Sequence, residues 1–275
     1  MAVADLVVVI TGPILNEIVL YHFPNSFLSI TPVCSLIAVL HNAATVLSVW
    51  LTVTFTFDRF VAICCDKLKT KYCSEKTAAV VVGTVSLLGC LVSLPWYFTR
   101  KQYYIFDNVP MCCTIISNFF TSPIWEAFEM FDRVLTPYFP LLLILLLNAL
   151  TVRRILSSRK VRRGLQGHSK GKKHKDLEME NRRKSIILLF TISGSFVLLW
   201  MTQSVFIIYR RIADILYFVS STDPVFITER TSNMLQLLSS CTNTFIYTVN
   251  QTKFRQELKK AVKYPLNLIV KLVKS

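Results

Sequence analysis

Ionisable side chains interrupt the longest apolar stretches of this chain, where a charge is costly. Asp5 and Glu17 fall in the first stretch, and His41 falls in the second. A charged group at the centre of a bilayer costs about 2.5–3.5 kcal/mol even on insertion-based scales, so such residues are functional candidates by default. Glu17 lies near the outer end of its stretch and can reach the lipid headgroups. Asp5, in contrast, is predicted to be an acid that faces the protein interior.

The second apolar stretch carries a narrow polar stripe. Its members recur every three or four residues, which places them on one face of a helix; they are His41, Thr45, Ser48, Thr52, Phe55 and Arg59. Because a polar stripe cannot face lipid, we expect this helix to be central in a bundle, with its stripe ending at Asp58-Arg59. The alternative is that Thr and Ser only form hydrogen bonds between helices, which explains Thr45 and Thr52 well and His41 poorly.

Small polar side chains also crowd the last apolar stretch. They are Ser239, Ser240, Thr242 and Asn243, followed by Tyr247, with Asn233 and Gln236 on the outer half. Taken singly, such residues more often serve helix packing than chemistry. Their density favours a hydrated interior.

Motifs for catalysis or for a structural metal do not accompany this pattern. The chain has no H-E-x-x-H sequence, and Gly194-Ser195 is better explained by close helix packing than as a nucleophile. Cys64, Cys65 and Cys73 lack the paired C-x-x-C spacing of a zinc site, so we interpret them as free thiols. We therefore predict a protein that is not an enzyme and has no metal centre or organic cofactor.

Helices that cross a membrane must position these residues. Of the 275 residues, 53% are hydrophobic and only 17% are charged, which is too apolar for a water-soluble globule. Each long run can cross a hydrocarbon core of about 30 Å at about 1.5 Å per residue, and none alternates like a barrel strand. The sequence predicts an all-α transmembrane bundle with six spans, at about 2–20, 33–57, 77–98, 132–152, 185–209 and 231–250.

The cationic residues are segregated between the connections. Of the 31 Lys and Arg residues, 25 fall in 58–76, 153–184 and the tail 251–275, and six fall in the other three connections. The positive-inside rule therefore places these three segments, and with them the C-terminus, in the cytoplasm. The excess of positive charge then indicates anionic lipid rather than nucleic acid as its partner. The first span follows Met1 almost directly, which indicates either a truncated chain or a natural six-span protein.

Anchor residues in a particular order resemble the rhodopsin-like (class A) G-protein-coupled receptors. Asp58-Arg59-Phe60 ends a span in which Arg59 lies 25 positions after Cys34, as in the third helix of that family, and Ala4-Asp5-Leu6 resembles the second-helix motif. The other anchors are Trp50, Pro95, Pro140, Phe196, Trp200, Asn243 and Tyr247. The resemblance begins partway along helix two. It implies a seven-helix architecture of which helices two to seven are present.

A narrower similarity concerns the ligand. The run from Val49 to Cys65 and the sequence Asn-Thr-Phe-Ile-Tyr at 243–247 are similar to the group named probable G-protein coupled receptor 139. That group implies a small extracellular ligand, an aromatic amino acid or a peptide-like molecule.

The chain also departs from the family pattern. Thr202 and Thr244 stand where the sixth and seventh helices usually have proline, so the usual kinks are not implied here. Asn148 replaces a frequent Tyr of helix five, and Arg182 replaces the acid that often pairs with Arg59.

The resemblance assigns roles to residues already singled out. It implies a ligand pocket at His41, Thr45, Trp200, Gln203 and Asn233, and G-protein coupling and activation through Asp58, Arg59, Asn243 and Tyr247. It also implies a polar cluster of Asp5, Ser48, Ser240 and Asn243 that holds a sodium ion in the family. In an oxidising exterior, Cys34 is expected to form a disulfide with Cys113 or Cys112.

These expectations define a receptor in the plasma membrane. Residues 1–250 form the transmembrane bundle, and 251–275 form a cytoplasmic tail with an amphipathic helix. Its partners are a heterotrimeric G-protein, a small extracellular ligand and the lipid bilayer, with no nucleic acid. The competing class is a transporter or channel, which would also have a polar interior, but the sequence shows no internal repeat, no filter-like loop and no pair of helices broken by Gly or Pro.

Overall fold

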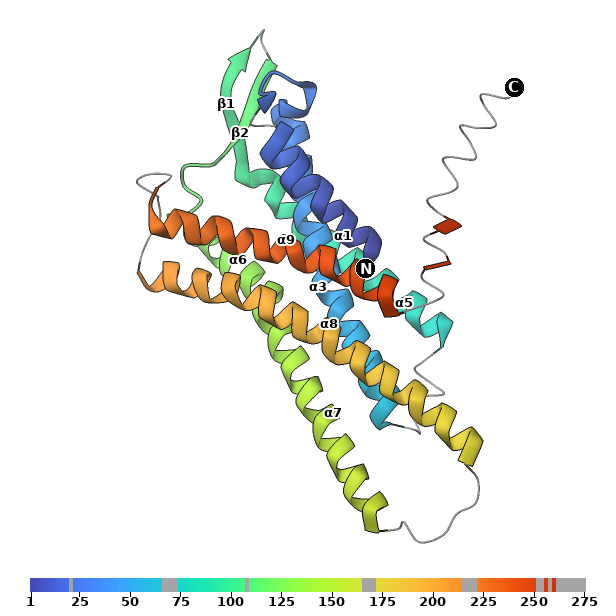
Figure 1. Ribbon diagram of the computed structural model, residues 1–275. Helices are drawn as coiled ribbons and strands as arrows, with labels where there is room; N and C mark the ends of the chain where they lie inside the picture. The colour runs from blue at the N-terminus through green and yellow to red at the C-terminus, as the bar shows by residue number, and fades with distance from the viewer. Residues whose placement is uncertain are drawn as a thin grey trace, which may run out of the picture.

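The computed structural model describes residues 1–19, 22–65, 74–106, 109–164, 172–213, 222–250, 255–256 and 259–260. Within these ranges the chain forms a bundle of long helices, with a β-hairpin at one end (Figure 1). The C-terminal end of α7 and the N-terminal end of α8 lie at the opposite end of the molecule. We call this the inner end and the hairpin end the outer end, after the predicted topology. Most of the predicted tail, 251–275, lies outside the described residues.

The first two spans are helical from end to end. Helix α1 (Ala2–Val9) continues as the π-helix η1 (Ile10–Val19), which contains Pro13. Proline lacks an N–H and clashes with the carbonyl four residues earlier, which accounts for the wider helix at this point. A 3-10 turn, η2 (Phe27–Ser29), leads to α3 (Thr31–Cys64), the longest helix of the N-terminal half.

The remaining helices follow in the predicted order. Helix α5 (Glu75–Ser93) begins at Ser74, whose Oγ accepts a hydrogen bond from the N–H of Thr77 at 3.2 Å, and it ends in η3 (Leu94–Thr99). The fourth span is composite: α6 (Pro123–Arg133), the π-helix η4 (Val134–Tyr138) and α7 (Phe139–Gly164). It is followed by α8 (Lys172–Ile212) and α9 (Pro224–Asn250).

Five described helical segments are long and apolar enough to cross a membrane: Ala2–Val19, Thr31–Cys64, Glu75–Thr99, Pro123–Ser157 and Arg183–Ile212. Helix α9 has 27 residues but is more polar than these five. Its polar side chains include Ser232, Ser239, Ser240 and Asn243. All four are buried in the protein interior. A polar face against the protein interior is compatible with a membrane-spanning position.

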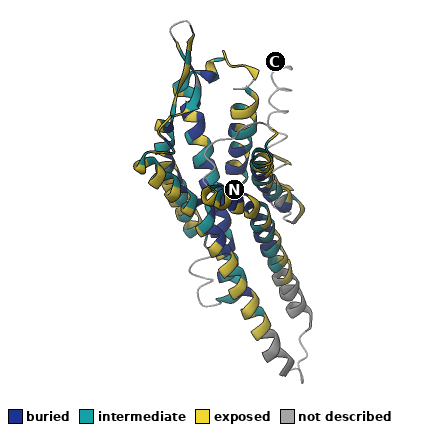
Figure 2. Cartoon of the chain, turned by 90° about the vertical axis from the view of Figure 1, so that its left-hand side faces the viewer, coloured by how far each residue is buried: buried dark blue, intermediate teal, exposed yellow. Residues whose placement is uncertain are grey.

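Helix α3 is central, as its polar stripe predicts. It packs against α1, α5, α7 and α8, and its middle part is buried (Figure 2). Three helices contribute to the main apolar core, with Val49 and Val53 from α3, Leu141 and Ile144 from α7, and Phe196 and Trp200 from α8. Helix α5, in contrast, is largely exposed: only 11% of its most apolar segment is buried in the protein. Its outward face is suited to lipid.

The connection between the third and fourth predicted spans, 99–131, has regular secondary structure. It contains an antiparallel hairpin, β1 (Arg100–Phe106) and β2 (Val109–Ile115), and the start of α6. The hairpin is the one departure from the all-α prediction within the described ranges. Tyr103, Tyr104 and Ile105 favour a strand, and Pro123 at the first turn favours a helix start after Ser122.

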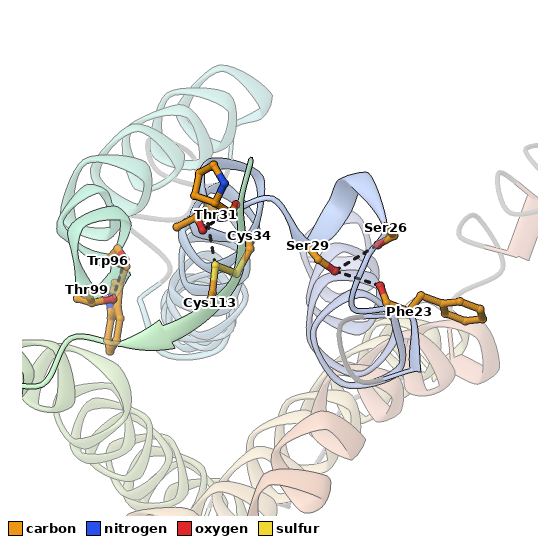
Figure 3. The surroundings of a disulfide bond; sticks show 9 residues. Phe23, Ser26, Ser29, Thr31, Cys34, Trp96, Thr99 and Cys113 are labelled. Atoms are coloured by element: carbon orange, nitrogen blue, oxygen red, sulfur yellow. Dashed lines mark hydrogen bonds between the residues drawn. A yellow bond between two sulfur atoms is a disulfide. The ribbon is translucent and has the colours of Figure 1, made fainter. Parts of the chain in front are cut away.

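The hairpin is attached to the outer end of α3. Cys113 of β2 forms a disulfide with Cys34, which joins residues 79 positions apart (Figure 3). Next to it, the hydroxyl of Thr31 donates a hydrogen bond to the carbonyl of Pro110 at 3.1 Å. The expected disulfide of Cys34 is therefore confirmed, with Cys113 as its partner; the side chain of Cys112 lies outside the described residues.

Removal of the disulfide should loosen the hairpin. A cross-link over a loop of this length stabilises a protein by about 2–4 kcal/mol, so we expect Cys34→Ala to lower the thermal unfolding temperature of the purified protein clearly. Cys112→Ala is the matched control and should retain both the disulfide in non-reducing peptide maps and the unfolding temperature. A Cys34→Ala protein as stable as the parent would contradict a stabilising role.

Candidate functional site

A buried carboxyl group lies where three helices meet. Asp5 of α1 is 2% exposed, and its Oδ1 accepts a hydrogen bond from Ser48 Oγ of α3. The side chain of Asn243 from α9 interacts with the same carboxyl group. Ser240, one turn before Asn243, is also buried. The structure thus brings together Asp5, Ser48 and Asn243, which the sequence assigned to one polar cluster.

Two oxygen atoms in this cluster have no donor among the described residues. Asp5 Oδ2 and Asn243 Oδ1 are both buried without a hydrogen-bond partner. A buried carboxylate needs a proton or a cation, and oxygen ligands suit a hard cation such as sodium. The residues present therefore fit such an ion, with Asp5 supplying the negative charge.

In the described contacts, His41 bonds to η1 of the first span and not to the other predicted pocket residues. Its Nδ1 lies 3.1 Å from Thr11 Oγ1 of η1, and its ring also interacts with the backbone of Val8. The hydroxyl of Thr11 donates to the carbonyl of Val7 at 2.7 Å, so the oxygen of Thr11 is left to accept a hydrogen bond from the N–H at His41 Nδ1. His41 is then a neutral or charged donor at this nitrogen.

The other predicted pocket residues lie on α3, α8 and α9. Thr45 donates to the carbonyl of His41 in its own helix at 2.8 Å, while Gln203 of α8 accepts a hydrogen bond from Ser232 of α9 through Oε1. The ring of Trp200 packs on that of Phe196, with 5.4 Å between the ring centroids. Asn233 is half-buried on α9. The described contacts join Gln203 to α9 but do not join His41 to Trp200, Gln203 or Asn233.

The inner end of α3 carries an ion pair between neighbours. Arg59 Nη2 lies 3.0 Å from Asp58 Oδ2, and both side chains are about one-third exposed (35% and 38%). The guanidinium also lies over the ring of Phe55, 5.3 Å from its centroid. Asn243 of the predicted activation set lies in the polar cluster instead, and the side chain of Tyr247 is outside the described residues, as is that of Arg182.

Charged contacts at the outer surface were not predicted from the sequence. Arg210 pairs with Glu229 at 3.3 Å, Arg211 with Glu126 at 2.9 Å, and Arg230 with Glu17 at 2.8 Å. Glu17 therefore has a protein partner in addition to any headgroup. A cavity of about 270 Å³ opens beside the first two pairs, between α6 and the outer end of α8. The alternation of acids and arginines near helix ends was the available sequence signal, but their pairing depends on the fold.

Asn148 forms a second contact that the sequence did not reveal. Its Nδ2 donates to Ser193 Oγ of α8 at 2.8 Å, while Ser193 donates to the carbonyl of Leu189 at 2.7 Å. The residue that departs from the family's usual Tyr therefore joins α7 to α8 in their inner halves.

Gly12 of η1 lies against His41 of α3, and a substitution there tests the His41 contact. A Cβ at Gly12 would lie 2.9 Å from His41 Cε1, so Gly12→Ala must displace the imidazole from Thr11. We expect Gly12→Ala to lower the free energy of unfolding by about 1–3 kcal/mol, as for other overpacked sites. A Cβ at Gly83 meets nothing within 4 Å, so Gly83→Ala is the matched control and should be neutral or stabilising. Equal unfolding temperatures for the two variants would show that His41 is not held as described.

Comparison with known proteins agrees with this geometry. Residues 1–247 match the family described as 7 transmembrane receptor (rhodopsin family). The chain is also similar to neuropeptide receptor 22 of Caenorhabditis elegans, with 24% identity over 259 residues. That alignment covers 93% of this chain and 58% of the relative, so the chain spans somewhat more than half the relative's length. The chain belongs to the rhodopsin family of seven-transmembrane receptors.

Proposed function

We propose that this receptor binds a small extracellular ligand, an amino acid or a peptide-like molecule, and activates a heterotrimeric G-protein. The observation that carries the proposal is the course of α3. One central helix extends from the disulfide-held outer hairpin, past His41 and Ser48, to the exposed ion pair of Asp58 and Arg59. A change at the outer end therefore has a continuous, packed element through which to bias the inner end.

The inner ion pair suits a protein partner. Its two side chains remain partly exposed, so an acidic or carbonyl group of a G-protein can compete for Arg59 at little desolvation cost. No covalent step is needed, because a ligand that binds the active arrangement more tightly shifts the population toward it. The Asn148–Ser193 hydrogen bond between α7 and α8 would have to break if the inner ends of these helices separate.

The ligand class follows from the pocket that we propose at His41, Thr45, Trp200, Gln203 and Asn233. Apart from the Trp200 ring these are neutral donors and acceptors, with His41 as the one titratable group, and no carboxylate stands at the His41 position to pair with a simple amine. The name of the worm relative, a neuropeptide receptor, supports a peptide-like ligand. The similarity to the group of probable G-protein coupled receptor 139 favours aromatic amino acids as the first compounds to test.

The orientation and location are part of the same proposal. The connections that hold 25 of the 31 Lys and Arg residues face the cytoplasm of the plasma membrane, and so does the C-terminus. The hairpin and its disulfide then lie outside the cell, where oxidising conditions maintain the bond. A transporter or channel, the alternative class, has no support from the family match.

Nucleotide exchange on an added G-protein tests the function. We expect aromatic amino acids or short peptides to stimulate exchange, and Arg59→Ala to reduce it about 10- to 100-fold, because charge-assisted hydrogen bonds are lost at the G-protein interface. Lys76→Ala, which removes another exposed cation predicted to face the cytoplasm, is the matched control and should retain the response. Ligand-driven ion or solute flux in the same vesicles without exchange would favour a transporter or channel.

We further propose that Asp5, Ser48, Ser240 and Asn243 hold a sodium ion that modulates the receptor. With Asp5 ionised, replacing sodium chloride by choline chloride should lower the thermal stability of the ligand-free protein or change agonist affinity. Asp5→Asn removes the charge and should abolish the sodium dependence, whereas Glu17→Gln, at an exposed ion pair, should retain it. A sodium-insensitive parent protein would indicate that Asp5 is protonated and bonded to its neighbours.

A further inference from the structure

One arginine at the outer end of the bundle lacks a partner among the described residues. Arg133, Arg210, Arg211 and Arg230 each pair with a glutamate. Arg100 does not: within the described part of the chain it has no ion pair, and its Nε is buried with no hydrogen-bond acceptor. By sequence alone, Arg100 is only one of the six cations outside the basic segments.

The position of Arg100 is fixed by the hairpin. It is the first residue of β1 and pairs with Ile115, two residues beyond the disulfide-bonded Cys113. The N–H of Ile116 donates to the carbonyl of Thr99 at 3.0 Å and closes the base of the hairpin. Figure 3 shows Cys113 beside Cys34 and Thr31 at the end of α3, with Thr99 beside Trp96 farther to the left. These contacts hold the backbone at Arg100 in place, and the residue is half-buried.

The electrostatic surroundings are unfavourable for an isolated cation. Burial lowers the pKa of the Arg100 guanidinium from its ordinary value, and no carboxylate among the described residues offsets this effect. Arg100 also interacts electrostatically with His41, which lies two helical turns below Cys34 on α3. The two side chains therefore lie within electrostatic range of each other. A buried charge without a counter-ion is costly.

We propose that Arg100, together with His41, forms the carboxylate subsite of the ligand pocket. The proposal rests on the function proposed above and adds to it that the ligand carries a free carboxylate. The planar guanidinium can bind both oxygens of a carboxylate at once, which a lysine at this position could not do. The carboxylate supplies the negative charge that the described residues do not, and it enters from the side of the bundle predicted to be extracellular.

Thermal unfolding of the purified receptor tests this without a G-protein. The probes are N-acetyl-L-phenylalanine and its amide, which differ only at the carboxylate, and sodium chloride at the same concentration. A ligand that binds the folded state raises the unfolding temperature. We expect the acid alone to produce a clear increase. Equal increases with acid and amide, an equal increase with chloride, or no increase with the acid would each overturn the subsite.

Variants locate the effect. Arg100→Gln should weaken binding of the acid about 10- to 100-fold, the size expected for losing charge-assisted hydrogen bonds. Arg100→Lys should lose part of this affinity. Lys101→Gln removes the neighbouring exposed cation and should leave the response unchanged. If Lys101→Gln weakens binding of the acid as much as Arg100→Gln does, the acid responds to the general positive charge of the surface and the subsite is refuted.

The ligand-free proteins distinguish binding from a structural role. Since Arg100 has no described partner, Arg100→Gln should unfold at the same temperature as the parent or higher. A large decrease would show that the arginine stabilises the hairpin and would overturn the proposal. Nucleotide exchange separates this inference from the proposed function. If only the acid raises the unfolding temperature and no nucleotide exchange occurs, the subsite is retained and G-protein coupling is refuted. If acid and amide drive exchange equally, the coupling is retained and the subsite is refuted.

Discussion

Polar groups inside a bilayer must find their partners within the protein, and this constraint organises the bundle around α3. Most of its threonines satisfy the requirement locally: Thr45, Thr52 and Thr56 each donate to the carbonyl four residues earlier in the same helix. Ser48 and His41 instead bond to the first span, at Asp5 and Thr11. Only these two of the described polar stripe residues make hydrogen bonds to another helix, so they determine how α1 and η1 lie against α3.

The same constraint explains which expectations followed from the sequence. The period of three and four residues predicted the buried face of α3, and the density of small polar residues predicted the inward face of α9, because both depend only on positions along one helix. The hypothesis that Thr45 and Thr52 join helices was wrong, since their hydroxyls reach their own backbone. Sequence spacing gives the face on which a hydroxyl lies but not which of two acceptors it selects.

Contacts between distant segments were harder to predict. The sequence offered Cys112 and Cys113 equally to Cys34, and the register of the hairpin decides for Cys113. The partners of Gln203 and Asn148, Ser232 and Ser193, are single serines among many in apolar helices. Arg100 is the clearest case, because what distinguishes it from the other arginines is the lack of a described carboxylate nearby, and this can be recognised only after the fold has placed the acids.

The hydrogen bonds of His41 and Gln203 also bear on how a ligand would be recognised. In the structure, His41 Nδ1 and Gln203 Oε1 already bond to Thr11 and Ser232. A neutral ligand group that replaces either partner exchanges one hydrogen bond for another and gains little net free energy. Arg100 differs because its Nε has no acceptor to give up. An anionic group bound there gains a charge-assisted interaction without breaking an existing one, so the affinity of such a pocket would come mainly from the carboxylate, and the neutral residues would mainly determine orientation.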